Sequence, residues 1–165
     1  MSFEKRMKCL EDIKETGFQT GCGFMVGSPY QSSDTLAADL KFIEKFKPHM
    51  CGIGPFIPHK DTPFGSCPAG TAELTVSLLS LIRLIRPDIL LPATTALGTI
   101  DNMGREKGIL AGANVVMPNL SPVSERKKYM LYNDKICMDE EAAENLAALK
   151  RKVSATDRGD FKNII

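Results

Sequence analysis

The sequence has no excess of either charge. Its 21 Lys and Arg residues are balanced by 20 Asp and Glu residues, which leaves a formal net charge of +1. A protein that binds nucleic acid or an anionic membrane surface usually carries a strongly basic face, so this balance argues against both kinds of partner. With 43% hydrophobic residues, the composition predicts a folded globular domain and excludes a disordered chain.

A long hydrophobic run is also missing. A helix that spans a bilayer needs roughly 20 consecutive apolar residues, and no segment approaches that length. Residues 1–6 read MSFEKR and are mostly polar or charged, so they do not resemble a secretory signal peptide. We therefore expect a cytoplasmic protein with no membrane partner.

Short metal-binding motifs are absent as well. None of the five cysteines belongs to a Cys-x-x-Cys pair or to a Cys/His cluster that could close a zinc site: Cys9, Cys22, Cys51, Cys67 and Cys137. Scattered thiols of this kind are typical of a reducing compartment. The spacing predicts no metal site on this chain.

The sequence does contain short apolar segments that alternate with amphipathic helices. Four segments are expected to form buried strands: 18–27, 49–54, 89–93 and 113–117. Three longer helices are expected: one from Ser2 to Gly17, one from Ser32 or Ser33 to Pro48, and one that contains Leu74 to Ile85 and stops before Pro87. Further helices are expected near 104–111, from Ser121 toward Tyr132, and from about Asp139. This repetition of βαβ units predicts an α/β fold with a parallel sheet.

The apolar spacing also predicts which side of each helix faces the core. Residues three and four apart form one stripe of a helix. The expected inward residues are Phe3, Met7, Leu10 and Ile13 in the first helix, Leu36, Leu40, Ile43 and Phe46 in the second, and Leu74, Leu78, Leu81, Ile82 and Ile85 in the third.

Ligands of parallel α/β folds bind at the C-terminal ends of the strands, which selects four segments: 25–29, 54–59, 92–99 and 117–122. Thr94 and Thr95 offer hydroxyl and amide groups that could hold a carboxylate, or they could simply satisfy the backbone at the strand end. The glycines at 52 and 54 do not begin a dinucleotide-binding fingerprint, because residue 57 is Ile and Pro55 lacks an amide hydrogen.

Other single residues each have two interpretations. His59 with Asp61 could be an acid/base pair or two metal ligands, or a hydrated loop pair without a third ligand nearby. Met25 and Met117, at strand ends, could pack against an adenine or fill the core. Cys51 lies inside an apolar strand and is expected to be an inert buried thiol.

Four of these segments together resemble one family. They are 23–31 (GFMVGSPYQ), 52–63 (GIGPFIPHKDTP), 92–99 (PATTALGT) and 112–119 (GANVVMPN). The chain resembles, from about Ser2 to Cys137, the radical S-adenosylmethionine (radical SAM) proteins of the HydE type, which mature FeFe-hydrogenase and are relatives of biotin synthase. The adjacent threonines favour the HydE type over biotin synthase or methylornithine synthase.

The resemblance implies part of a (β/α)₈ barrel. Residues 1–137 would be the C-terminal half of a radical SAM barrel, the region associated with biotin and thiamin synthesis, with about four parallel strands. Residues 138–165 would be a C-terminal helix and tail that cap it. A full barrel typically needs about 250 residues, so 165 residues fall short of one.

The resemblance also implies the site. Met25, Ile57 and Pro58 would line the S-adenosylmethionine side of the cavity, and Thr94, Thr95 and Tyr132 the substrate side. The family binds a 4Fe–4S cluster through Cys-x-x-x-Cys-x-x-Cys, which this sequence lacks, so the cluster is expected on a missing or separate N-terminal half. Cys137 matches the first of three cysteines that hold a second cluster in some members, but no cysteine follows it.

We therefore expect a truncated or split radical SAM protein that supplies half of the cavity for S-adenosylmethionine and a small-molecule substrate. Such a chain would carry no catalytic residue of its own and would be inactive alone. A half barrel leaves strand edges and an apolar face uncovered, so we expect a homo-oligomer or a separately encoded N-terminal half as partner. The alternatives are a non-catalytic small-molecule-binding or scaffold domain, and an enzyme that uses His59 and Asp61.

Overall fold

The computed structural model describes residues 1–126, together with Lys128, Leu131, Tyr132, Ile136, Ala147, Arg151 and Ser154. The prediction for Cys137 lies outside the described residues. The same holds for the helix and tail predicted over 138–165, apart from three single positions. None of the described helices is both long and apolar enough to cross a membrane.

Two parallel strands form the centre of the fold. β1 (Gly21–Val26) pairs with β2 (Met50–Pro55), and Cys22 lies opposite Cys51 in the register. Burial alternates along both strands, because successive side chains point to opposite faces. One face of this pair is therefore committed to the core and the other is not.

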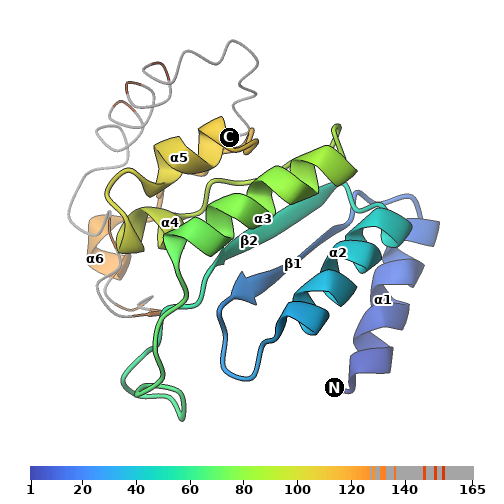
Figure 1. Cartoon of the computed structure of the whole chain (residues 1–165), viewed down its shortest axis with the longest axis horizontal. Helices are drawn as coiled ribbons and strands as arrows, with labels where there is room; N and C mark the ends of the chain where they lie inside the picture. The colour runs from blue at the N-terminus through green and yellow to red at the C-terminus, as the bar shows by residue number, and fades with distance from the viewer. Residues whose placement is uncertain are drawn as a thin grey trace.

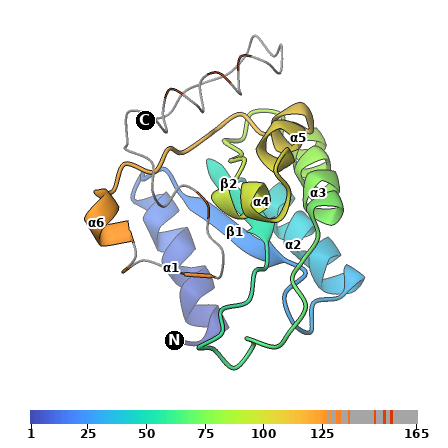
Figure 2. The ribbon, with the colours of Figure 1, turned by 90° about the vertical axis from the view of Figure 1, so that its left-hand side faces the viewer.

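Helices cover the core face. α2 (Ser33–Phe46) connects the two strands, and α3 (Ala72–Ile85) follows β2 after a long loop. Figures 1 and 2 show α2 and α3 on the same side of the strands. The remaining described helices are α1 (Phe3–Glu15), α4 (Thr95–Ile100), α5 (Gly104–Leu110) and α6 (Val123–Arg126).

Side-chain caps fix where the longer helices begin. Ser2, Ser32 and Thr71 each accept a hydrogen bond from an amide in the first turn of α1, α2 and α3. Ser32 forms a full capping box, because the Thr35 hydroxyl also accepts from the Ser32 amide. The cap of the second helix is thus Ser32, one of the two serines that the sequence allowed.

The third and fourth predicted strands differ from expectation. Their segments run parallel to the sheet but pair only at single bridges, Met50 with Leu90 and Pro92 with Val115. The Leu91 amide donates to the Asn114 side chain at 2.8 Å, and Pro92 has no amide hydrogen. A continuous ladder cannot form across this stretch, so two of the four expected segments appear as strands.

The described residues confirm an α/β arrangement with parallel strands, while the half barrel stays a prediction. β1 and β2 lie beside the Leu90 segment, and that segment lies beside Val115. Backbone hydrogen bonds of 2.9 Å join the Cys51 amide to Leu90 and the Ala93 amide to Val115. The chain order is therefore also the spatial order, as in consecutive βαβ units.

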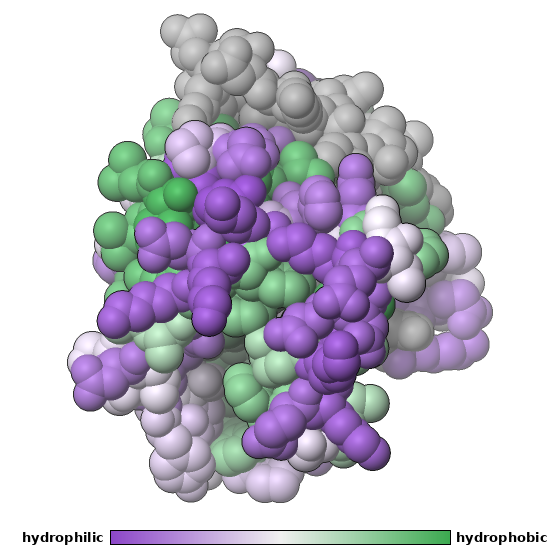
Figure 3. Space-filling model, turned by 90° about the vertical axis from the view of Figure 1, so that its right-hand side faces the viewer, coloured by the Kyte–Doolittle hydropathy of each residue, from purple (hydrophilic) through white to green (hydrophobic). Residues whose placement is uncertain are grey.

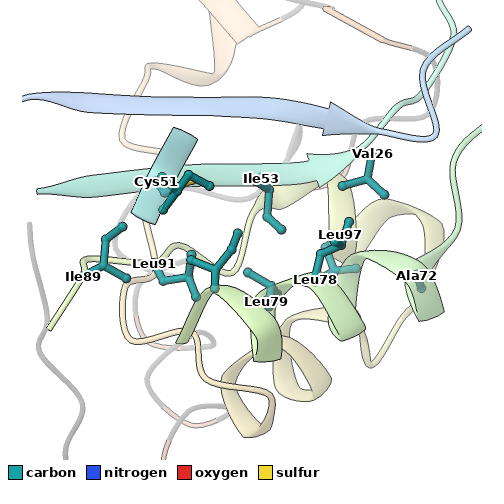
Figure 4. Close-up of a cluster of buried hydrophobic side chains, with 11 residues drawn as sticks. Val26, Cys51, Ile53, Ala72, Leu78, Leu79, Ile89, Leu91 and Leu97 are labelled. Atoms are coloured by element: carbon teal, nitrogen blue, oxygen red, sulfur yellow. The ribbon is translucent and has the colours of Figure 1, made fainter. Parts of the chain in front are cut away.

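The main core lies between the strands and α3. Figure 4 shows side chains from β1, β2, α3 and the Leu91 segment pointing into one shared space. Its most enclosed members, each at most 1% exposed, are Val26, Ile43, Cys51, Ile53, Leu79, Ile82, Ile89, Leu91 and Leu97. Burying each of these larger aliphatic side chains contributes about 1.5–3 kcal/mol, which makes this cluster the main source of stability.

Helix orientations only partly follow the predicted stripes. In α3 the buried side chains are Ala72, Thr75, Leu78, Leu79 and Ile82, whereas Leu74 and Leu81 are 40% and 45% exposed. The prediction for Leu74 and Leu81 was wrong because α3 is apolar on more than one side, and tertiary packing chose which side faces the strands. The expected stripe of α2 is confirmed at Ile43, with Leu36 and Leu40 packed against the core.

α1 lies at the edge of the molecule. None of its residues is buried, and Phe3 is 71% exposed, so its predicted inward stripe has no complete partner among the described residues. Lys14 joins it to α2 by donating to the Phe46 carbonyl and by lying 4.7 Å from the centre of the Phe46 ring. Figure 3 shows the side of α1 and α2 as largely hydrophilic with smaller hydrophobic areas between.

Candidate functional site

The face of the strands opposite the core is mostly glycine: within β1 and β2, four of its six positions are glycine, and the other two are Met25 and Met50. Gly21, Gly23 and Met25 of β1 are exposed, and on β2 the positions on this face are half-buried. Glycine at alternate positions removes the side chains that would otherwise fill the space above the sheet. The result is a flat backbone surface bordered by the Met25 side chain, which is 58% exposed.

The reason for glycine differs between two positions on this face. A Cβ atom built on Gly23 would collide with the carbonyl of Gly52, so the close approach of the two strands demands glycine at position 23. Among the described residues, no atom would lie within 4 Å of a Cβ atom built on Gly52. Gly52 is therefore not required by packing, and its missing side chain leaves open space on the exposed face.

Loops tie the C-terminal ends of β1 and β2 together. The Val26 carbonyl accepts from the Phe56 amide at 2.8 Å, and the Phe56 carbonyl accepts from Gly70 at the same distance. Gln31 closes the loop after β1, since its side chain accepts from the Gly27 amide and donates to the Met25 carbonyl at 2.9 Å. These bonds hold the strand ends that would line a ligand site.

Gly54 links β2 to the start of α4. It lies opposite Met25 in the register, and a Cβ atom built on it would be 2.6 Å from the Thr94 hydroxyl oxygen. Only glycine allows this approach without displacement of the threonine. Met25 and Thr94, predicted on opposite sides of one cavity, therefore flank Gly54 at the same end of the fold.

Thr94 and Thr95 have different roles at the start of α4. The Thr94 hydroxyl caps the helix by accepting from the Leu97 amide at 3.4 Å, which is the structural use that the sequence left open. The Thr95 hydroxyl accepts from the Arg105 guanidinium at 2.8 Å. Both threonines are half-buried, so each retains a surface that a ligand could reach.

The other predicted site residues are placed less closely. Ile57 and Pro58 are half-buried and directly follow Phe56, whose amide is bonded to the end of β1. Tyr132 is half-buried, and nearby Ile136 contacts α4 through its amide, 3.5 Å from the Thr99 hydroxyl. The structure thus brings Met25 and Thr94 together, and their grouping with Ile57, Pro58 and Tyr132 in one cavity stays a prediction.

His59 and Asp61 form a local turn. The His59 ring nitrogen Nδ1 accepts from the Asp61 amide at 3.2 Å and lies 3.8 Å from the Asp61 carboxylate, which is 73% exposed. Within the described part of the chain, no three His, Cys, Asp or Glu side chains lie close enough to hold a metal ion. The described residues therefore do not fit an iron–sulfur cluster, and His59 has no third ligand there.

Two features of the site were not predicted from the sequence. Arg105 was assigned only to a short helix, yet its guanidinium reaches Thr95. The glycines at 21, 23, 52 and 54 follow a period of two in both strands, a signal that could have indicated a bare sheet face. Met25 and Met117 are 58% and 52% exposed, so the core-filling interpretation of these residues was wrong.

The chain is similar in sequence to parts of two kinds of radical SAM protein. No protein-family model matches the chain. The chain is 49% identical over 139 residues to the [FeFe] hydrogenase maturase subunit HydE of Thermotoga maritima, an alignment that covers 84% of this chain and 40% of that protein. It is 28% identical over 116 residues to biotin synthase of Corynebacterium urealyticum, which covers 68% of this chain and 33% of the relative.

Methylornithine synthase appears in both the sequence and the structure comparison. The Methanosarcina barkeri 3-methylornithine synthase is 27% identical over 124 residues, covering 75% of this chain and 35% of the relative. The crystal structure of methylornithine synthase (PylB) matches with a TM-score of 0.74 at 20% identity, over 100% of this chain and 46% of that one. The chain thus spans less than half the length of each of these relatives.

Proposed function

We propose, from the premise that this chain is related to part of the HydE and biotin synthase-like radical SAM proteins, that it forms one wall of a cavity for S-adenosylmethionine and a small-molecule substrate. The observation that carries the proposal is the exposed glycine face of β1 and β2, which ends at Gly54 beside the Thr94 hydroxyl. The space above Gly52 would accept a flat ligand group, since no side chain of the part of the chain that the structure describes lies within 4 Å of a Cβ atom built there.

The proposed roles follow the two ends of this wall. Met25, Ile57 and Pro58 would bind the adenosine part of S-adenosylmethionine, because an exposed thioether and apolar side chains pack well against an aromatic ring. Thr94, Thr95 and Tyr132 would hold the substrate through their hydroxyl groups. The proposed role of these residues is to bind and orient S-adenosylmethionine and the substrate. None of them is proposed to exchange a proton with the reacting atoms.

The electron would have to come from outside the described site. In radical SAM chemistry an iron–sulfur cluster supplies an electron to the sulfonium of S-adenosylmethionine, and the protein positions and shields the reactants. These 165 residues contain no Cys-x-x-x-Cys-x-x-Cys motif. We therefore assign the cluster to another segment, on the same polypeptide or on a separate N-terminal half, and expect the present chain to be inactive alone.

Titration calorimetry with S-adenosylmethionine and S-adenosylhomocysteine tests the wall. We expect the full chain to bind both, and Gly52→Val to weaken binding by about tenfold or more, because its side chain would occupy the open space. Leu84→Ala is the matched control, since Leu84 is 77% exposed on α3, away from this face. Equal affinities for the wild type and Gly52→Val would contradict the proposed wall.

Anaerobic reconstitution with iron and sulfide tests the second part of the proposal. The isolated chain should form no stable 4Fe–4S chromophore and should release no 5′-deoxyadenosine from S-adenosylmethionine. Release of 5′-deoxyadenosine by the isolated chain would show that it is catalytically complete and would overturn the division of roles proposed above.

A further inference from the structure

Arg105 is a buried cation without a counter-ion in the described part of the chain. It is only 8% exposed, and no carboxylate among the described residues forms an ion pair with it. Its Nη2 donates to the Thr95 hydroxyl oxygen at 2.8 Å, whereas Nε has no partner among the described residues. A guanidinium stays protonated at any physiological pH, so this charge is permanent.

Burial of such a charge normally requires an anion or a set of acceptors. Removing an ion from water is costly unless paired charges or hydrogen bonds compensate. Among the described residues, the acceptor for this guanidinium is one neutral hydroxyl oxygen. An anionic ligand group beside Thr95 would offset the charge that these residues leave uncompensated.

The bond to Arg105 also determines what Thr95 can do. Because its oxygen already accepts from the guanidinium, its hydroxyl hydrogen must point elsewhere. That hydrogen is donated to no described residue, and Thr95 is half-buried. The Thr95 hydroxyl hydrogen is therefore available to an acceptor on a ligand, and the adjacent positive charge would increase its strength as a donor.

We propose that Arg105 is a positioning and specificity residue: it orients the Thr95 hydroxyl as a donor and makes this end of the site prefer a carboxylate to a neutral group of the same shape. The proposal rests on the proposed function, in which Thr95 faces the substrate. It adds that the substrate group bound beside Thr95 is negatively charged, and that Arg105 is the residue that selects this charge.

Arg105 also has a packing role that a test must separate from recognition. Its aliphatic carbons lie against Gly98 of α4, where a built Cβ atom would be 3.3 Å from Arg105 Cγ. Loss of the side chain would thus loosen the contact between α4 and α5 whether or not a ligand binds. Variants that keep the aliphatic stem, Arg105→Lys and Arg105→Gln, address this.

The experiment is an NMR titration of the full chain with acetate and, separately, with the neutral isostere acetamide at constant ionic strength. In the wild type we expect acetate to shift the amide signals of 94–97 saturably, with an affinity at least about tenfold higher than that of acetamide. Arg105→Gln should remove this preference for acetate, whereas Arg105→Lys, which keeps a positive charge, should retain a measurable part of it.

The amide spectrum of Arg105→Gln would show whether this variant folds. If it does not, two variants of Thr95 test the proposal instead. Thr95→Val removes the hydroxyl at nearly constant volume and should abolish the acetate response, while Thr95→Ser should retain it. Preference for acetate in Arg105→Gln or Thr95→Val equal to that of the wild type would overturn the proposal. So would an equal response of the wild type to acetate and acetamide.

Failure of this inference and failure of the proposed function give different results. If the cavity wall is wrong, S-adenosylmethionine binding is insensitive to Gly52→Val, whatever the acetate titration shows. If only the role of Arg105 is wrong, Gly52→Val still weakens S-adenosylmethionine binding while the acetate preference survives in Arg105→Gln.

Discussion

At the scale of single residues, the register of the two strands creates a pair of thiols. Cys22 and Cys51 are direct neighbours across β1 and β2, and Cys51 is fully buried whereas Cys22 is half-buried. The Cys51 thiol donates a hydrogen bond to the Cys22 sulfur, which lowers the pKa of Cys22, although burial opposes this. That bond, followed by burial, raises the pKa of Cys51. The two cysteines lie in adjacent apolar strands, yet their pKa values move in opposite directions.

This difference predicts the pH dependence of alkylation. Because the thiolate is the reactive form and the pKa of Cys22 is lowered, its labelling by iodoacetamide should begin at lower pH than that of an ordinary thiol of similar exposure. Cys51→Ala removes the donor, so the labelling profile of Cys22 should move to higher pH. Mass spectrometry of labelled peptides measures both profiles.

Cys67→Ala is the control for the labelling experiment, since Cys67 lies in the loop after β2 and is not a register partner of Cys22. Its removal should leave the Cys22 profile unchanged. Identical Cys22 profiles in the wild type and in Cys51→Ala would show that the strand partner does not set the pKa.

At the scale of elements, the close approach of β1 to β2 assigns different roles to two facing glycines. Gly23 and Gly52 are register partners on the exposed face, but a Cβ atom at position 23 would collide with the Gly52 carbonyl, whereas one at position 52 would meet no atom of the described residues within 4 Å. Sequence alone shows two equivalent glycines in two similar strands. Only the spacing of the paired backbones distinguishes them.

Chemical denaturation of Gly23→Ala and Gly52→Ala tests this asymmetry. Gly23→Ala should lower the free energy of unfolding by about 1–3 kcal/mol or more, as expected when an added group forces the backbone to shift. Gly52→Ala should be neutral or stabilising by up to about 1 kcal/mol, because alanine loses less conformational freedom on folding. Equal effects of the two substitutions would contradict the close approach of the strands at Gly23.

α3 offers a second test at the scale of elements. Leu79 is fully buried in the main core, while Leu84 on the same helix is 77% exposed. Leu79→Ala should reduce the free energy of unfolding by about 2–5 kcal/mol, since it removes buried surface and leaves a cavity. Leu84→Ala should change it by less than about 0.5 kcal/mol. Thermal or urea unfolding of both variants measures the difference, and a Leu84→Ala loss as large as that of Leu79→Ala would mean that α3 packs through its other side.

At the scale of the whole molecule, unpartnered surfaces gather along one edge. Within the described residues, β1 pairs only with β2, and α1 beside it buries none of its residues. An open strand edge next to a helix that exposes apolar side chains, here Phe3 and Ile13, is a surface that isolated domains usually cover. We propose that this edge contacts either a second copy of the chain or a separate half that holds the cluster.

Static light scattering of the purified chain, alone and with a candidate cluster-binding half, tests that assembly. We expect a mass of at least twice 18.1 kDa for the chain alone, or a one-to-one complex with the other half. Replacing Phe3 and Ile13, which are 71% and 38% exposed on α1, by Asp should weaken the association by about tenfold or more. Leu110→Asp, at a 64% exposed position on α5, is the control. A chain that is monomeric alone and also does not bind the candidate cluster-binding half would contradict the proposal.

The sequence by itself determined the alternation of apolar segments and helices, the Ser2 cap of α1, the choice of Ser32 or Ser33 as the cap of α2, and the resemblance to HydE. These depend on short-range spacing: an apolar residue every three or four positions, a serine before a helix, a glycine after a strand. It also selected the strand ends as the place for a site, and the structure brings two of the predicted residues there, Met25 and Thr94, to either side of Gly54.

Only the tertiary structure decided which side of α3 is buried, why the third and fourth strands remain single bridges, and what Arg105 contacts. Each depends on groups distant in sequence: Asn114 takes the Leu91 amide, and Arg105 reaches back ten residues to Thr95. Charge balance could not reveal a buried guanidinium, because a net charge of +1 does not indicate where any cation lies. Burial, not composition, makes that side chain a candidate for recognition.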